Sequence, residues 1–228
     1  MGKKVKHPQV QIDQNTYLRI PIKTHVVMKD DQLLSVVAQY AKDHIQEGDI
    51  LFVTEKIVAI TQGRAIPLKD IHPRPLARFL SSHVTKTPAG IGLGMPETME
   101  MALQECGVPR ILFAAGASAV TKLFGKRGVF YEIAGYRAQS IDGPTPNTIP
   151  PYNEHVVLGP DRPDAVAKEI ATHLNVKTVV VDINDIDGNV LGASDPSLDR
   201  DLIVRILKDN PLGQDHEQTP MGIIRQQG

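Results

Sequence analysis

The chain has 228 residues and a formal net charge of -1 at pH 7, because 25 Lys and Arg nearly balance 26 Asp and Glu. Its 41% hydrophobic and 22% charged residues are typical of a globular protein and exclude a mainly disordered chain. A chain of this length can bury a substantial core without disulfides. The small net charge gives no general attraction to nucleic acid or to an anionic membrane, so we expect neither as a partner.

The single cysteine, Cys106, excludes an internal disulfide and a cysteine-rich zinc site, and fits a reducing compartment. We predict a buried thiol rather than a nucleophile, because no activating histidine lies near it in the sequence. The sequence contains no apolar run long enough to span a bilayer. Cytoplasm is therefore the expected compartment.

The first half of the chain predicts strands that alternate with helices. Residues 17–22 alternate as a strand, which Pro21 restricts to an edge or an exit. Residues 49–60 predict a strand that passes into a helix near Glu55. The other elements predicted here are helices at 31–44, 75–83 and 97–106, a strand at 110–115, a helical turn at 117–123 and a strand at 129–134.

The second half begins with a proline-rich segment, residues 140–152, that predicts a shaped loop. Residues 177–182 predict a strand buried on both faces, because β-branched residues fill it without a break. Helices are predicted at 164–174 and at 195–208, the second with Asp195 as its N-cap, and a short strand at 221–224. The whole pattern predicts a mixed α/β fold.

Acidic and amide side chains follow the predicted strand at 177–182. Asp182, Asp185 and Asp187 alternate there with two asparagines, at the end of a buried strand where α/β proteins place ligand sites. Oxygen ligands of this kind suit magnesium, manganese or calcium. An EF-hand is excluded, because its fifth position would be Ile186. A solvated Asp-Gly turn remains the alternative interpretation.

Two further segments are open to a functional and a structural interpretation. Asp142 lies in the proline-rich loop, and a rigid loop often aims a side chain, so it is a second candidate metal ligand. The alternative is an Asp-Gly turn in which Asp142 bonds its own backbone. The glycine-rich residues 90–96 could line a phosphate with backbone amides or form a plain turn. The eight histidines show no metal-ligand spacing.

The chain resembles the coenzyme F420-0:gamma-glutamyl ligase family in four stretches, which are residues 18–23 with 47–64, residues 140–145, residues 179–189 and residues 213–225. Members of this family join glutamate to a deazaflavin and use GTP and a divalent metal. The likeness covers about residues 17–225. It implies a mixed α/β fold that is intertwined, with a mixed sheet and flanking helices. Residues 1–228 would form a single ligase-like unit, which could contain two interlocked subdomains.

Carried over by position, the resemblance implies a metal site for magnesium or manganese at Asp142 and Asp185, with Asp187 close by. It implies no catalytic residue beyond the metal ligands, and it implies a homodimer. A GTP-binding side would be formed by Leu18, Arg19, Ile20, Pro21, Glu55 and Lys56.

The chain departs from the family pattern at several positions. Ile60 replaces a lysine, Ile186 replaces a threonine, and Pro144 and Thr145 replace Ser-Asn. The predicted function is a metal-dependent, nucleotide-driven ligase that adds L-glutamate or a similar amino acid to a small carboxylate acceptor such as coenzyme F420-0. The alternatives are a non-catalytic ligand-binding module and a metal-dependent phosphohydrolase.

Overall fold

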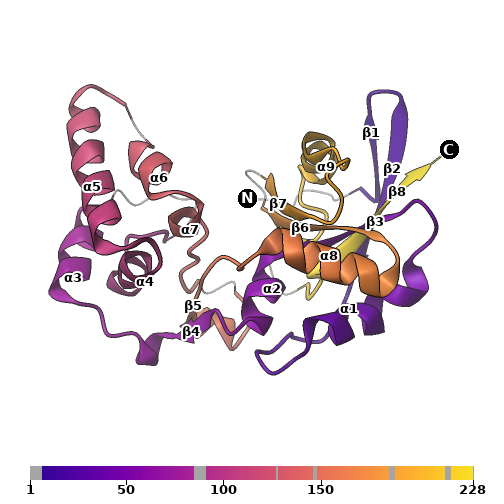
Figure 1. Cartoon of the computed structure of the whole chain (residues 1–228), viewed down its shortest axis with the longest axis horizontal. Helices are drawn as coiled ribbons and strands as arrows, with labels where there is room; N and C mark the ends of the chain where they lie inside the picture. Colours follow the sequence, from indigo (N-terminus) through magenta and orange to yellow (C-terminus); the bar gives the residue numbers. More distant parts are fainter. Residues whose placement is uncertain are drawn as a thin grey trace. The chain divides into compact units, whose positions relative to one another are not determined.

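The structure is a computed structural model that describes residues 7–84, 91–126, 128–145, 148–184, 188–213 and 217–227 (Figure 1). The chain divides into two compact units. Residues 1–63 and 160–228 form the first, which we call the sheet unit, and residues 64–159 form the second, which we call the helical unit. Whether both act as one ligase-like unit stays a prediction.

The sheet unit contains a six-stranded mixed sheet. Two neighbours, β3 (Ile50–Thr54) and β6 (Lys177–Ile183), are parallel, and all the other neighbouring pairs are antiparallel. The predicted mixed α/β fold with flanking helices is therefore confirmed. Across the sheet the strands are β1 (Gln9–Ile12), β2 (Asn15–Ile22), β8 (Met221–Gln227), β3 (Ile50–Thr54), β6 (Lys177–Ile183) and β7 (Gly188–Ala193).

The central strands carry the core of the sheet unit. Residues 178–181 of β6 are fully buried, which confirms the prediction of a strand covered on both faces. Strand β8 is longer than predicted and lies inside the sheet, between β2 and β3. Strand β1 pairs with residues 15–18 of β2 only, so Pro21 lies beyond its reach, where a missing N–H costs no strand pairing.

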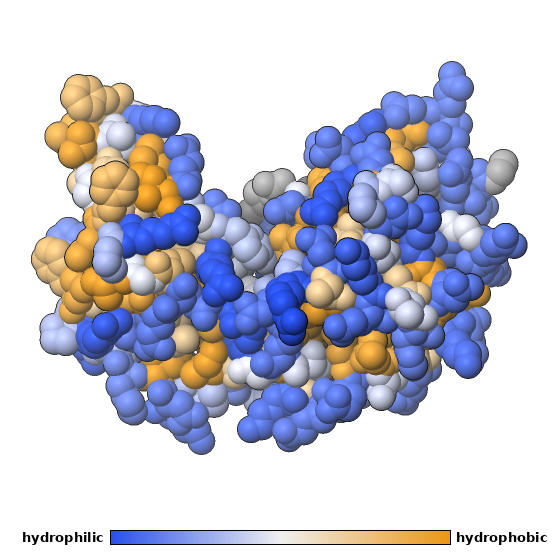
Figure 2. Space-filling model, in the orientation of Figure 1, coloured by the Kyte–Doolittle hydropathy of each residue, from blue (hydrophilic) through white to orange (hydrophobic). Residues whose placement is uncertain are grey.

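Helices cover the sheet. Helix α8 (Pro163–Leu174) lies along β6 and β7, and α1 (Leu33–Ala41) packs against α8 (Figure 1). Helix α9 (Arg200–Leu207) buries its apolar side against Phe52 and Val179. Hydrophilic side chains cover most of the face of the sheet unit seen in Figure 2, as expected when the strands keep their apolar residues inside.

The last helix starts later than predicted. The N-cap of α9 is Asp199, whose carboxylate accepts a hydrogen bond from the Leu202 amide at 2.9 Å. Asp195 instead accepts a hydrogen bond from the Ser197 amide at 2.8 Å, which closes a local turn. Both aspartates carry the same local signal, and the packing of Ile203 and Ile206 on the sheet selects the second.

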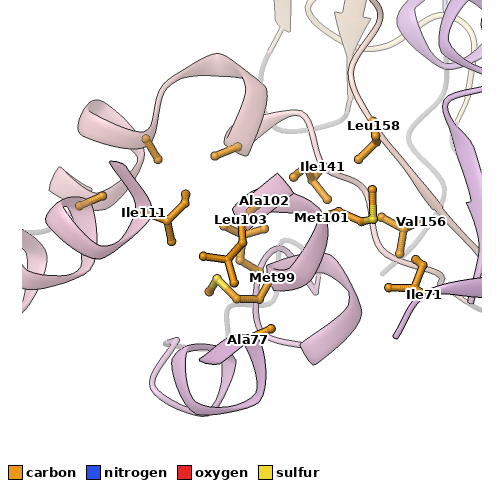
Figure 3. Close-up of a cluster of buried hydrophobic side chains, with 14 residues drawn as sticks. Ile71, Ala77, Met99, Met101, Ala102, Leu103, Ile111, Ile141, Val156 and Leu158 are labelled. Carbon is orange, nitrogen blue, oxygen red and sulfur yellow. The ribbon is translucent and has the colours of Figure 1, made fainter. Parts of the chain in front are cut away.

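The helical unit is built around α4 (Pro96–Cys106). Met99 and Leu103 of α4 meet Ile111 of α5 (Val108–Leu123) in its core (Figure 3). Cys106 packs at the margin of this core, and burial raises the pKa of its thiol, which supports the predicted structural role. The other elements are α3 (Pro75–Ser82), α5 (Val108–Leu123), α6 (Val129–Ala134), α7 (Tyr136–Gln139), β4 (Ala65–Pro67) and β5 (His155–Val157), the two strands pairing antiparallel.

Two predicted strands of this unit are wrong. Residues 110–115 belong to α5, and residues 129–134 form α6. Only Ile111 and Ala114 of α5 are buried, at the i, i+3 spacing of a helix face, and the alanines in this stretch favour the helix. Short apolar runs cannot be assigned from their periodicity alone, and packing decided both cases.

A buried carboxylate in this unit predicts a dependence of stability on pH. Glu100 is 3% exposed and accepts hydrogen bonds from the Arg74 amide at 3.0 Å, from Arg74 Nε at 2.9 Å and from Gln104 Nε2 at 3.0 Å. Burial opposes ionisation of Glu100, but these hydrogen bonds outweigh it and hold its pKa below the usual value. The stabilisation is therefore present at neutral pH and is lost as the pH falls through the lowered pKa.

We expect Glu100→Gln to lower the free energy of unfolding by about 2 kcal/mol at neutral pH, because one charge-assisted partner of Arg74 is lost. The deficit should shrink as the pH falls, first through the ordinary pKa of the unfolded chain and then through the lowered pKa of the native protein, where its carboxyl group also becomes protonated. Urea unfolding at several pH values, followed by circular dichroism, measures both quantities. A deficit that stayed constant with pH would contradict the assignment.

Candidate functional site

Three strands of the sheet unit end at the same edge of the sheet. Strands β3 and β6 are parallel, and β2 shares their direction because β8 is antiparallel to both β2 and β3. The carboxyl ends of β2, β3 and β6 therefore meet at one edge, which we call the carboxyl edge. In α/β proteins the ligand site usually lies outside this end of the strands.

The junction of β3 and α2 (Glu55–Thr61) brings two predicted residues to the carboxyl edge. Glu55 and Lys56 form the first turn of α2 and are half-buried. The following residues, Ile57 to Ile60, are buried and hold the helix in place. The Thr54 amide donates to the Pro220 carbonyl at 2.9 Å, which fixes the end of β3 as well. The base of Lys56 is thus held by rigid elements, as a binding residue requires.

The end of β6 brings side chains that carry oxygen atoms to the same edge. Asp182 pairs with Asn189, and Ile183 pairs with Gly188, in the hairpin of β6 and β7. Asp182 and Asn184 are half-buried there. The predicted ligands Asp185 and Asp187 lie outside the described residues. Their convergence with Asp142 on one cation stays a prediction.

The four predicted nucleotide-binding residues on β2 differ in how far they are exposed to solvent. Pro21 is exposed near the carboxyl edge, while Leu18 and Ile20 are half-buried. The Arg19 side chain is 2% exposed, forms an ion pair with Asp209 and donates to the Ile206 carbonyl at 3.1 Å. The guanidinium group of Arg19 thus anchors the end of α9.

Asp142 belongs to the helical unit and sits in an ordered part of the proline-rich loop. Its amide donates to the Val157 carbonyl at 2.8 Å, and the Val157 amide donates back to Asp142 at 2.9 Å. The neighbouring Ile141 is buried, whereas Asp142 is exposed. A Cβ on Gly143 would lie 3.2 Å from a methyl group of Thr98, so the loop packs closely on α4. An anchored backbone with an exposed carboxylate suits a metal ligand.

The described part of the glycine-rich segment forms a turn. The Gly94 amide donates to the Ile91 carbonyl at 3.0 Å, and Leu93 is 1% exposed in the core of the helical unit. A backbone hydrogen bond also joins Leu93 to the Tyr131 hydroxyl, whose pKa is raised by burial. These contacts favour the plain turn over a phosphate-binding loop. Gly90 lies outside the described residues.

The Asp182 carboxylate and the Asn184 amide both carry an oxygen atom of the kind that a hard cation prefers. Within the described ranges, no three His, Cys, Asp or Glu side chains lie close enough together to hold a metal ion. The predicted ligands Asp185 and Asp187 lie outside these ranges, so a metal site that includes them stays a prediction.

Residues 218–220, among which the sequence predicted no site residue, cross the carboxyl edge. The Gln218 carbonyl accepts from the Thr24 amide at 2.9 Å, and Pro220 accepts from Thr54. The Thr219 hydroxyl donates to the Leu212 carbonyl at 2.5 Å. Residues 218–220 thus connect the ends of β2 and β3. No local motif marks this arrangement, because it depends on the central position of β8.

A small cavity of the sheet unit lies away from the carboxyl edge. It has a volume of about 110 Å³ and lies between α9 and the start of β3, with Tyr17, Ile50 and Ile206 in its lining. Pockets for nucleotide-sized ligands usually measure about 300–1,000 Å³. This cavity is therefore too small and too apolar for a nucleotide.

Comparisons with known proteins support the resemblance. The sequence model of the F420-0:Gamma-glutamyl ligase family matches residues 21–197. A curated relative, the Coenzyme F420:L-glutamate ligase of Methanopyrus kandleri, is 25% identical over 238 residues, which cover 90% of this chain and 84% of that protein. The matched range includes the ends of β3 and β6 and the loop of Asp142.

Proposed function

Because the chain belongs to the F420-0:gamma-glutamyl ligase family, we propose that it is a nucleotide-driven ligase that joins L-glutamate or a similar amino acid to a small carboxylate acceptor such as coenzyme F420-0. The observation that carries the proposal is the meeting of Glu55, Lys56 and Asp182 at the carboxyl edge. The positive charge of Lys56, beside acidic side chains that could hold a divalent cation, suits the binding of nucleotide phosphates.

In the proposed reaction the acceptor carboxylate attacks the γ-phosphorus of GTP, and GDP leaves. The glutamate amine then attacks the acyl carbon, an amide bond forms, the nitrogen loses a proton, and phosphate departs. Lys56 would face the phosphate charge, with Glu55 and residues Leu18 to Pro21 on the nucleotide side. A magnesium or manganese ion held by Asp142, Asp185 and Asp187 would screen that charge.

The resemblance also implies a homodimer, and we propose that state for the protein in solution. A non-catalytic ligand-binding module is the second candidate. One observation favours it: Ile60, at the position of the family's lysine, is 3% exposed, so it is part of the core. A phosphohydrolase is the third candidate, and it would cleave nucleotide without an acceptor.

Calorimetric titration with manganese and GTP tests the ligase. We expect each ligand to raise the affinity for the other at least about tenfold, because the two share phosphate oxygens and reciprocal coupling is a thermodynamic necessity. The substitution Asp185→Asn should abolish this coupling, and Asp161→Asn, an acidic residue of the same unit outside the proposed site, should preserve it.

The outcomes separate the candidates. Coupled binding followed by amide formation from glutamate and coenzyme F420-0 supports the ligase. Binding that is indifferent to nucleotide supports the module, and GTP cleavage without an acceptor supports the phosphohydrolase. Sedimentation velocity in the same buffers measures the proposed homodimer.

A further inference from the structure

The outer side of α5 in the helical unit carries an exposed apolar surface. Phe113 is 70% exposed, Leu123 is 84% exposed and Phe124, directly after the helix, is 83% exposed. Leu112 and Val120 are also exposed. At helical spacing these five residues share an arc of about 120°, and we call them the α5 stripe. Figure 2 shows the corresponding apolar colour along the left margin of the view, where Figure 1 places α5.

The size of the α5 stripe calls for an explanation. A phenylalanine buries about 150–250 Å² when it is covered, so five large side chains exposed to this degree approach the largest apolar patch of a typical monomer. Within the described residues of α5 only Ile111 and Ala114 are buried, so the helix turns most of its apolar content outward. Helices with this arrangement mark interaction surfaces.

The segment that carries the α5 stripe is rich in positive charge. From Cys106 to Tyr131 the sequence contains four Lys or Arg and no Asp or Glu. Arg110 and Lys122 are exposed on the two sides of the stripe, and Lys126 follows its tip. Lys126 lies 3.6 Å from Glu132 of α6, which neutralises part of its charge. The tip therefore presents Leu123 and Phe124 between basic residues.

We propose that the α5 stripe docks reversibly on an anionic membrane surface. An apolar helix face bordered by Lys and Arg is the pattern of segments that lie in the interface of a bilayer, where apolar side chains enter the acyl boundary and cations meet the headgroups. A second copy of α5 fits less well, because facing stripes would bring Arg110 and Lys122 against like charges. The docking needs no transmembrane segment, and among the described residues no helix is long and apolar enough to cross a bilayer.

The inference goes beyond the proposed ligase activity and does not depend on it. The test is co-sedimentation of the full chain with vesicles of phosphatidylcholine alone and with vesicles that also contain phosphatidylglycerol. We expect binding to the anionic vesicles at low salt, at least about tenfold weaker binding to the neutral ones, and a loss of binding at high salt.

Three variants locate the contact. The double substitution Leu123→Ser with Phe124→Ser should weaken binding at least about tenfold, because it removes the apolar tip. Lys122→Glu should weaken binding to anionic vesicles only. Met28→Ser, a control in the sheet unit where the side chain is 41% exposed, should bind as the unaltered chain does. Circular dichroism shows whether each variant folds.

Several outcomes overturn the proposal. One is equal binding to neutral and anionic vesicles, and another is no binding to either. A third is binding that survives the double substitution in a folded protein. The last is a dimer in sedimentation velocity that the double substitution converts to a monomer, since the α5 stripe would then be an interface between two copies.

Discussion

Replacing Lys56 with methionine is expected to reduce ligase turnover by about 100- to 1,000-fold, the usual cost of removing one preorganised group that stabilises developing charge. Methionine keeps an unbranched apolar stem of similar length and removes the charge, so the packing of α2 on β3 should be preserved. The buried residues that follow in α2, Ile57 to Ile60, are unaffected by the substitution. Steady-state kinetics with varied GTP measures the effect.

A matched control is Lys168→Met, which removes the charge of an exposed lysine on α8 in the same unit. Its turnover should stay within about twofold of the unaltered enzyme, since surface substitutions away from a site change little. If Lys56→Met retained full turnover while Asp185→Asn lost it, Lys56 would have no part in phosphate binding and the carboxyl edge would act through its acidic groups alone.

The elements around the carboxyl edge could be predicted because their signals are local. An unbroken run of β-branched residues makes β6 a buried strand, and a strand that passes directly into a helix at Glu55 is read from one continuous pattern. Once strand direction is known, Pro21, Glu55 and Asp182 fall on one edge without further information. The direction itself depends on β8 lying between β2 and β3, a contact between the two ends of the chain.

The role of Arg19 could not be predicted, because its partners are remote in sequence. The side chain lies on a strand and looks available for a ligand, yet its guanidinium group pairs with Asp209, 190 residues away. Such a pairing has no local signature. Pro21, by contrast, is exposed near the carboxyl edge.

The net charge of the whole chain does not reveal that one segment carries positive charges only. A net charge of -1 predicts no attraction to an anionic surface, and that holds for the average field. Among the charged residues of 106–131, however, all are positive. Because a strand was predicted at 110–115, the sequence did not predict that the apolar residues here share one side of a helix. As a strand, Leu112 and Phe113 would point to opposite faces, whereas on α5 they share one side with Leu123.

Gly192→Ala is expected to lower the free energy of unfolding by about 3–5 kcal/mol, enough to unfold a marginally stable protein. A Cβ at this position of β7 would lie 2.2 Å from the carbonyl carbon of Pro163, 2.4 Å from its oxygen and 2.5 Å from the Asp164 amide nitrogen. These are backbone atoms at the start of α8, so no side chain can rotate away. The helix would have to move off the sheet.

That movement would break other contacts. Asp164 accepts a hydrogen bond from the Ala193 amide at 2.9 Å and pairs with Arg200 at 3.0 Å, so β7, α8 and α9 shift together. The control is the same substitution in α5, Gly116→Ala, where a Cβ meets no atom within 4 Å. There alanine should stabilise the helix by about 0.5–1 kcal/mol. Urea unfolding followed by circular dichroism measures both, and opposite signs are expected because one Cβ meets backbone and the other meets open space.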